Sequence, residues 1–103
     1  IGAAAAALAG DPDIYWAGFI HDAQKEYAEA STLLELVTNN RVPLPAALAV
    51  EPAAYLNGLA EAAGELRRHL LDRLREGDVE YCERCLGWMD EIRRQVGVRY
   101  PFE

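Results

Sequence analysis

The sequence predicts an all-α protein, and two observations carry that prediction. Apolar residues recur at steps of three and four over three long segments, as is typical of amphipathic helices. No segment alternates apolar and polar residues with β-branched side chains, so we expect no strand. We therefore predict antiparallel amphipathic helices of an α-helical bundle over residues 12–39, 51–76 and 79–96, joined by short connectors.

The first helix is expected to begin where Asp11 can cap free amides and Pro12 fits the first turn. Residues 39–40 and the two prolines of 43–45 should end it, and residues 46–49 are long enough for one further helical turn. The predicted apolar stripe of this helix consists of Trp16, Phe19, Ile20, Ala23, Tyr27, Ala30, Leu34 and Val37.

The second and third helices are separated by Gly77, a residue that adopts a left-handed cap at little cost, and by Asp78, which can cap the third helix. The third helix is expected to stop at Gly97. The apolar face of the second helix is predicted to be Leu56, Leu59, Ala60, Ala63, Leu66, Leu70 and Leu74. That of the third is predicted to be Cys82, Cys85, Leu86, Met89, Ile92 and Val96.

Length and composition limit the function. The 103 residues fit a single helical domain over 1–103, and no apolar run approaches the length of a membrane span. Two cysteines do not make a disulfide framework, so we expect free thiols and a soluble, cytoplasmic protein without a membrane partner. The net charge of −7 argues against a general coat for DNA or RNA.

Three helices of this length bury only a thin core. The chain also opens on Ile1 rather than Met. We therefore expect a piece of a larger fold, which exposes apolar surface unless further segments or subunits cover it.

Glu26 and Glu29 share a face of the first helix, because they are three residues apart. One heptad further on, the same face carries Leu33 and Leu36, which suggests that it is partly buried. A buried carboxylate pair needs a cation or hydrogen bonds to compensate it. The alternative is the edge of an apolar stripe with solvated carboxylates.

Glu61 and Glu65 are four residues apart on the second helix, on a charged stripe opposite the leucines. Periodicity alone describes this stripe as a solvated surface. Small residues beside it would let another helix approach closely; they are Ala54, Gly58, Ala62 and Gly64. Two helices that each offer a carboxylate pair could together form an oxygen-rich site for Mg²⁺.

The basic residues cluster on the second and third helices, where they suit either surface ion pairs, such as Asp90 with Arg94, or contacts with phosphate. Cys82 and Cys85 have the spacing of half a zinc site, but buried free thiols explain them better, since only His21 and His69 could complete the ligand set. No nucleophilic triad is recognisable.

Three stretches resemble the translin family, most closely its catalytic branch, the translin-associated protein X (TRAX) type and its prokaryotic relatives. They are DAQKEYAEA at 22–30, YLNGLAEAAGELRRH at 55–69 and REGDVEYCERCLGWMDEI at 75–92. The similarity implies an all-helical domain, incomplete here, of a protein that assembles into closed homo-oligomeric or hetero-oligomeric shells around RNA.

The resemblance also implies an activity, Mg²⁺-dependent endonucleolytic cleavage of single-stranded RNA, with Mn²⁺ as a substitute metal. By position it assigns the catalytic and metal-binding roles to Glu26, Glu29, Glu61 and Glu65. Glu61 stands where the family also has Asp. Contacts to the nucleic-acid backbone would fall to Arg67 and Arg68.

Two further hypotheses remain open. One is a non-catalytic translin-like subunit that binds single-stranded RNA or single-stranded DNA without cutting it. The other is a helical assembly or scaffold protein whose carboxylates are merely solvated. A defined Mg²⁺ site would separate the scaffold from the metal-dependent enzyme.

Overall fold

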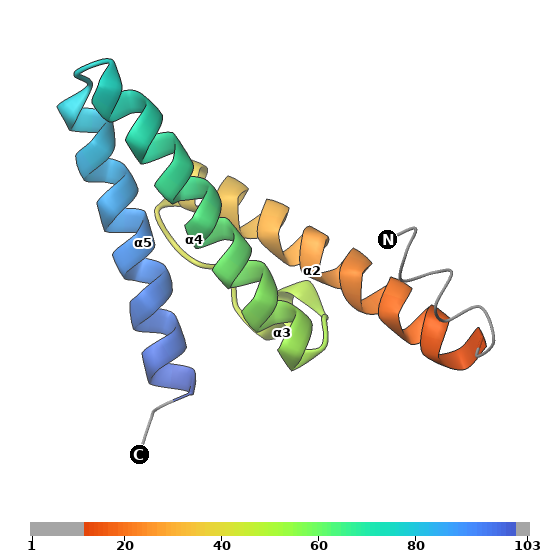
Figure 1. Ribbon diagram of the computed structural model, residues 1–103. Helices are drawn as coiled ribbons and strands as arrows, with labels where there is room; N and C mark the ends of the chain where they lie inside the picture. The colour runs from red at the N-terminus through yellow and green to blue at the C-terminus, as the bar shows by residue number, and fades with distance from the viewer. Residues whose placement is uncertain (1–11, 101–103) are drawn as a thin grey trace.

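The computed structural model describes residues 12–100 and confirms the all-α prediction within them (Figure 1). Three long helices, α2 (Pro12–Asn39), α4 (Pro52–Arg75) and α5 (Val79–Arg99), are accompanied by the short α3 (Pro45–Leu48). The bounds of α2 match the prediction, and those of α4 differ by one residue at each end. The predicted cap Asp11 lies outside the described residues.

Helix α5 is longer than predicted, because it continues through Gly97 to Arg99. The amide of Tyr100 donates to the carbonyl of Val96 over 2.8 Å, so the helical hydrogen bonding persists past the glycine. Glycine permits a helix to end but does not require it to. The predicted stop at Gly97 is therefore wrong.

Helices α4 and α5 form an antiparallel hairpin (Figure 1). Gly77 has a φ of +79°, the left-handed conformation that the sequence predicts. The carboxylate of Asp78 then accepts the amide of Tyr81 at 3.2 Å, which caps α5 as expected. Further along the hairpin, the thiol of Cys82 donates to the carbonyl of Leu70 at 3.3 Å.

The connector between α2 and α4 carries the chain back alongside α2. As a result, α4 begins beside the middle of α2, where the amide of Glu51 donates to Oε1 of Gln24 at 2.8 Å. The Tyr55 hydroxyl holds the connector by donating to the carbonyl of Pro43 at 2.9 Å. These bonds fix which part of α2 faces the first turns of α4.

The core lies between α4 and its two neighbours, and its buried residues are Leu36, Val42, Tyr55, Leu59, Ala62, Leu66, Cys85, Trp88 and Ile92. On α5 the prediction is wrong at one place. Trp88 is buried, whereas Leu86 is 56% exposed. The Trp88 indole N–H donates to Oδ1 of Asn40 at 2.8 Å, a contact with the end of α2 that periodicity does not reveal.

Helix α2 packs through a different face from the one predicted. Its buried residues are Ala28, Thr32 and Leu36, while all eight members of the predicted apolar stripe are exposed. Trp16, Phe19 and Ile20 precede the part of α2 that α4 covers, because α4 begins beside Gln24. Further along, α2 meets α4 through small residues, with Ala28 against Gly58. The chain thus exposes a row of large apolar side chains along α2, as its small size leads us to expect.

Within residues 12–100, no helix combines the length and the apolar character needed to cross a bilayer.

Candidate carboxylate site

The candidate site lies where α2 and α4 come closest, at Gly58. A Cβ placed on Gly58 would lie 2.6 Å from Cβ of Ala28 and 2.9 Å from the carbonyl oxygen of Lys25. It would also lie 3.0 Å from the backbone nitrogen of Glu29. Only glycine fits so near a neighbouring backbone. Glu61 and Glu65 follow Gly58 along α4 by one and two helical turns, so the contact brings them towards Glu29.

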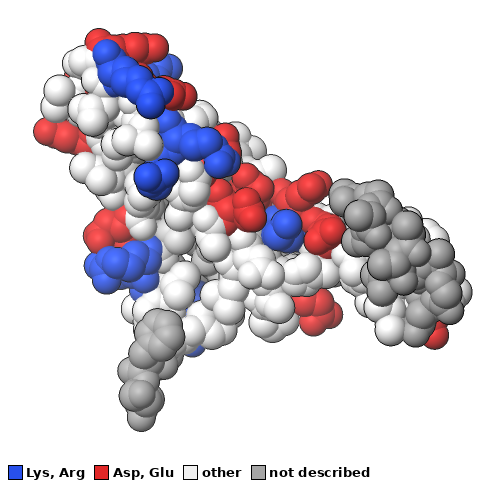
Figure 2. Space-filling model, viewed as in Figure 1, with Lys and Arg blue, Asp and Glu red and all other residues white. Residues whose placement is uncertain are grey.

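Electrostatics indicate that Glu29 is close to the two acids of α4. Burial raises the pKa of Glu29 above its ordinary value, and the negative charges of Glu61, Glu65 and Glu26 raise it further, while Lys25 opposes them. Figure 2 shows Asp and Glu side chains gathered where α4 lies against α2, with Lys and Arg mainly further along α4 and on α5. The charges of the other three predicted glutamates thus all act on the Glu29 carboxyl.

The four glutamates differ in exposure. Glu29 and Glu65 are half-buried, whereas Glu26 and Glu61 are exposed. The sequence prediction of a partly buried carboxylate face is therefore right for Glu29 but not for Glu26. Glu29 also shares its face with the buried Leu36, as expected.

Glu65 already has neighbours on its own helix that face its carboxylate. Its Oε2 accepts a hydrogen bond from Nη2 of Arg68, and its Oε1 lies 3.9 Å from Nε2 of His69. The hydrogen bond from Arg68 lowers the pKa of the Glu65 carboxyl. The same contact raises the pKa of Arg68, with smaller contributions from the charges of Glu61 and Glu29. The direct partner of Arg68 is therefore Glu65, an acid of the same helix.

The donor set fits Mg²⁺ in its chemistry, since carboxylate oxygens from two helices concentrate negative charge at one place. The side-chain positions differ from those of a formed metal site. No three His, Cys, Asp or Glu side chains within residues 12–100 are grouped so that they could hold a metal ion. Coordination by both pairs would require at least Glu65 to turn away from Arg68.

Arg67 and Arg68, the predicted nucleic-acid contacts, are both exposed on α4. Arg68 lies on the same face of α4 as Glu65, its ion-pair partner. Arg67 is two residues from Glu65, about 200° around the helix, and therefore lies on a different face. Nearby, the guanidinium of Arg73 lies 5.0 Å from the Tyr81 ring centroid and that of Arg84 lies 5.3 Å from it. Tyr81 and Arg84 are three residues apart on α5, whereas Arg73 comes from α4, a contact that no sequence spacing reveals.

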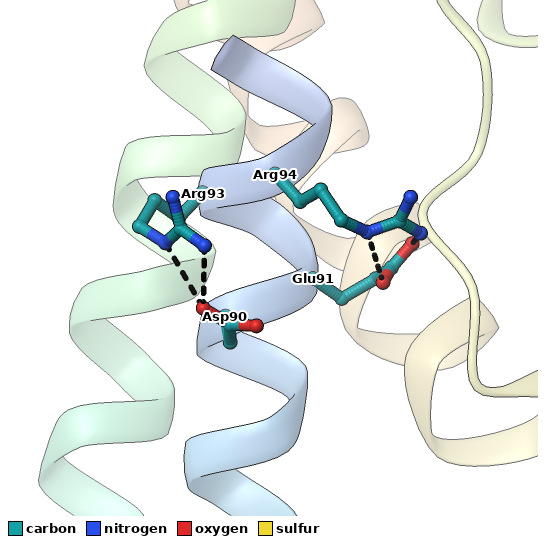
Figure 3. A network of polar contacts seen from close by, with 4 residues as sticks. All are labelled: Asp90, Glu91, Arg93 and Arg94. Carbon is teal, nitrogen blue, oxygen red and sulfur yellow. Dashed lines mark hydrogen bonds and ion pairs between the residues drawn. The ribbon is translucent and has the colours of Figure 1, made fainter. Parts of the chain in front are cut away.

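Other arginines form ordinary surface ion pairs (Figure 3). Arg93 pairs with Asp90 at 2.9 Å, and Arg94 reaches Glu91 through Nη2 at 2.6 Å and Nε at 3.2 Å. The prediction of an Asp90–Arg94 pair is therefore wrong, because each arginine pairs with the acid three residues before it. Exposed pairs of this kind contribute little to stability, because water and salt screen them.

Cys82 and Cys85 are buried free thiols, as predicted. Burial raises the pKa of the Cys85 thiol, and the neighbouring Cys82 raises it further. The Cys85 thiol thus favours the protonated, unreactive form.

Comparison with known proteins adds one relative. No family model matches this chain. An uncharacterized protein of the archaeon Methanocaldococcus jannaschii is 29% identical over 76 residues, which are 73% of this chain and 34% of the relative. The chain thus spans about a third of the length of that relative. No solved structure matches.

Proposed function

We propose that this chain belongs to a Mg²⁺-dependent endoribonuclease that cleaves single-stranded RNA, with Glu26, Glu29, Glu61 and Glu65 as its carboxylates. One observation carries the proposal: Glu29 of α2 lies among the negative charges of Glu61 and Glu65 of α4, at a helix contact that only Gly58 allows. The similarity of the sequence to the translin family supplies the reaction.

Each residue has a defined part in this proposal. The glutamates offer oxygens from two helices, and each helix contributes one half-buried member, Glu29 and Glu65. Arg68 binds the RNA backbone next to these oxygens and Arg67 binds it further around α4, which sets the register of the strand without reading its sequence. A bound Mg²⁺ would supply an activated water and neutralise charge on the phosphate.

We also propose that the protein works as an oligomer of identical or related subunits. The exposed apolar side chains along α2 support this, because large uncovered apolar surfaces are typical of interaction sites.

Cleavage of a labelled single-stranded RNA by the full-length protein tests the activity. We expect cutting in Mg²⁺ or Mn²⁺ and none in EDTA. Glu29→Gln should abolish cutting but preserve RNA binding, whereas Glu83→Gln, on an exposed part of α5, should leave both unchanged. Undiminished cutting by the Glu29→Gln protein would contradict the carboxylate mechanism.

The second candidate is a subunit that binds single-stranded RNA or DNA without cutting it. The ion pair of Glu65 with Arg68 favours this candidate, since it leaves that carboxylate neutralised by the chain itself. Tight binding of both nucleic acids, together with no cleavage in any divalent metal, would select it.

A further inference from the structure

Helix α2 carries two packing faces on opposite sides. One lies against α4 and holds the buried Ala28, Thr32 and Leu36. The other, which we call the α2 seam, consists of six exposed residues: Ile20, Ala23, Tyr27, Ala30, Leu34 and Val37. Leu34 is two residues from Thr32, about 200° around the helix. The contact with α4 therefore leaves the α2 seam uncovered.

The spacing of the α2 seam indicates the kind of partner that fits it. Its residues follow one another at alternating steps of three and four, an average of 3.5. This is the repeat with which one helix packs along another in a left-handed coiled coil. From Ile20 to Val37 the seam is about 27 Å long. The α2 seam thus fits a second helix that runs alongside α2.

The order of side-chain sizes favours a second copy of α2 in the antiparallel direction. The larger Ile20, Tyr27 and Leu34 alternate with the smaller Ala23, Ala30 and Val37. In a parallel pair each seam residue faces its own copy, so two tyrosines would crowd at position 27 and two alanines would leave a gap at position 23. In an antiparallel pair the larger residues face the smaller ones, which fills the space evenly. The seam is therefore complementary to itself when the two copies are antiparallel.

The open area is sufficient for a specific pair. Ile20 is 50% exposed, Tyr27 54%, Leu34 65% and Val37 59%. With the two alanines, roughly 500 Å² of one chain is uncovered, so a symmetric pair would bury about 1,000 Å², the least that a specific interface needs. No seam residue is charged, although the chain carries a net charge of −7. Two copies can consequently meet there without like charges inside the contact.

We propose that the α2 seam binds the α2 seam of a second copy of this chain, with the two helices antiparallel. This inference rests on the oligomer proposed above and names its contact. Each α2 then lies between α4 of its own chain and α2 of the other copy. Glu29 has its backbone against Gly58 of α4 and stays outside the pairing contact.

Sedimentation velocity of the full-length protein at several concentrations tests the pairing. Leu34→Glu should raise the Kd of the pair by more than about tenfold, because each pair would bury two unpaired carboxylates. The matched control is Leu86→Glu, which changes a leucine of α5 that is 56% exposed, and it should leave the Kd unchanged. Far-UV circular dichroism checks that both variants are folded.

A spin label tests the direction of the two helices. Thr38→Cys places a reactive thiol on an exposed position at one end of the α2 seam, whereas Cys82 and Cys85 are buried. In an antiparallel pair, pulsed electron paramagnetic resonance should measure more than about 25 Å between the two labels, since the ends of the seam point in opposite directions. A parallel pair, with helix axes about 8–10 Å apart, brings the labels much closer together. A shorter distance therefore overturns the antiparallel arrangement.

The outcomes separate the pairing from the proposed function. If the Leu34→Glu protein associates as tightly as the unchanged protein, the pairing through the seam is overturned and the proposed oligomer still stands. A full-length protein that stays monomeric overturns the oligomer and the pairing together. Loss of stability in a monomeric Leu34→Glu protein would then assign the seam to another helix of the same chain. Cleavage of RNA is a separate measurement, so its failure leaves the pairing untouched.

Discussion

The indole N–H of Trp88 donates a 2.8 Å hydrogen bond to Oδ1 of Asn40, which joins the middle of α5 to the residue that follows α2. Asn40 has a φ of +55°, a conformation that asparagine tolerates better than most residues. The same residue thus supplies both the reversal of the chain and the acceptor that fixes α5.

Substitution of Asn40 tests these two roles separately. Asn40→Gly keeps the left-handed backbone accessible and loses the hydrogen bond, at a cost of about 1 kcal/mol. Asn40→Ala loses the bond and also strains the backbone, so its free energy of unfolding should be lower by roughly another 1 kcal/mol. Urea denaturation followed by circular dichroism measures both. Equal stability of the two variants would show that the backbone is not constrained there.

Gly58 and Gly64 lie on the same helix but should respond oppositely to alanine. Gly58→Ala places a methyl group 2.6 Å from Cβ of Ala28, so the helices must separate, at a cost of about 1–3 kcal/mol. Gly64→Ala meets nothing within 4 Å and should stabilise α4 by about 0.5–1 kcal/mol. Thermal unfolding of the pair gives the comparison, and a stable Gly58→Ala protein would contradict the close contact.

The raised pKa of Glu29 predicts a pH-dependent stability. The folded state holds the Glu29 proton more tightly than the unfolded state, so wild-type stability falls as pH rises from about 4.5 through the folded pKa. Glu29→Gln should therefore raise the melting temperature at pH 7 in metal-free buffer. The gain should disappear as pH falls below about 4.5. A constant difference across this range would show that packing, not charge, is responsible.

Arg67 is predicted to contact an RNA phosphate. Arg67→Ala should weaken binding of single-stranded RNA and reduce the slope of log affinity against log salt by about 0.7, the contribution of one phosphate contact. Fluorescence anisotropy at several salt concentrations measures the slope. Arg93→Ala serves as the control, because Arg93 pairs with Asp90 on a different helix. An unchanged slope for Arg67→Ala would exclude it from the interface.

The burial of Cys82 and Cys85 predicts slow reaction with thiol reagents. In native buffer at pH 8, Ellman's reagent should modify them only as fast as the hairpin of α4 and α5 opens. In 6 M urea, roughly the concentration that unfolds small proteins, both should react at once. Rapid reaction in native buffer would place at least one thiol at the surface.

Residues that end or cap helices made most of the fold predictable. Pro12, Gly77 and Asp78 determine where helices begin and turn through local chemistry alone, which a sequence displays directly. The packing face of α2 was not predictable in this way. Gly58 of α4 lies against the small residue Ala28, and the more apolar stripe of α2 stays exposed. Which face of α2 is buried depends on how α2 and α4 pack against each other. The apolar periodicity of α2 alone does not show this.

The candidate site was also predictable only in part. The spacing of Glu26 with Glu29, and of Glu61 with Glu65, is visible in the sequence, as are the small residues that let the helices meet. The engagement of Glu65 by Arg68 depends on side-chain conformation within one helical turn. Three-residue spacing permits such a pair without requiring it. The sequence therefore could not indicate that Arg68 forms an ion pair with the Glu65 carboxylate.

The exposed start of α2 should make the chain sensitive to proteases at that end of the helix. Figure 1 shows this part of α2 extending away from α4 and α5, and the side chains from Trp16 to Ile20 are all exposed. A helical segment with so little packing opens often, and its bulky aromatic residues are preferred cutting points for chymotrypsin. Brief digestion of the chain should therefore cut after Trp16 and Phe19 first, while the peptide bonds around Leu36 and Leu59 resist until the whole bundle unfolds.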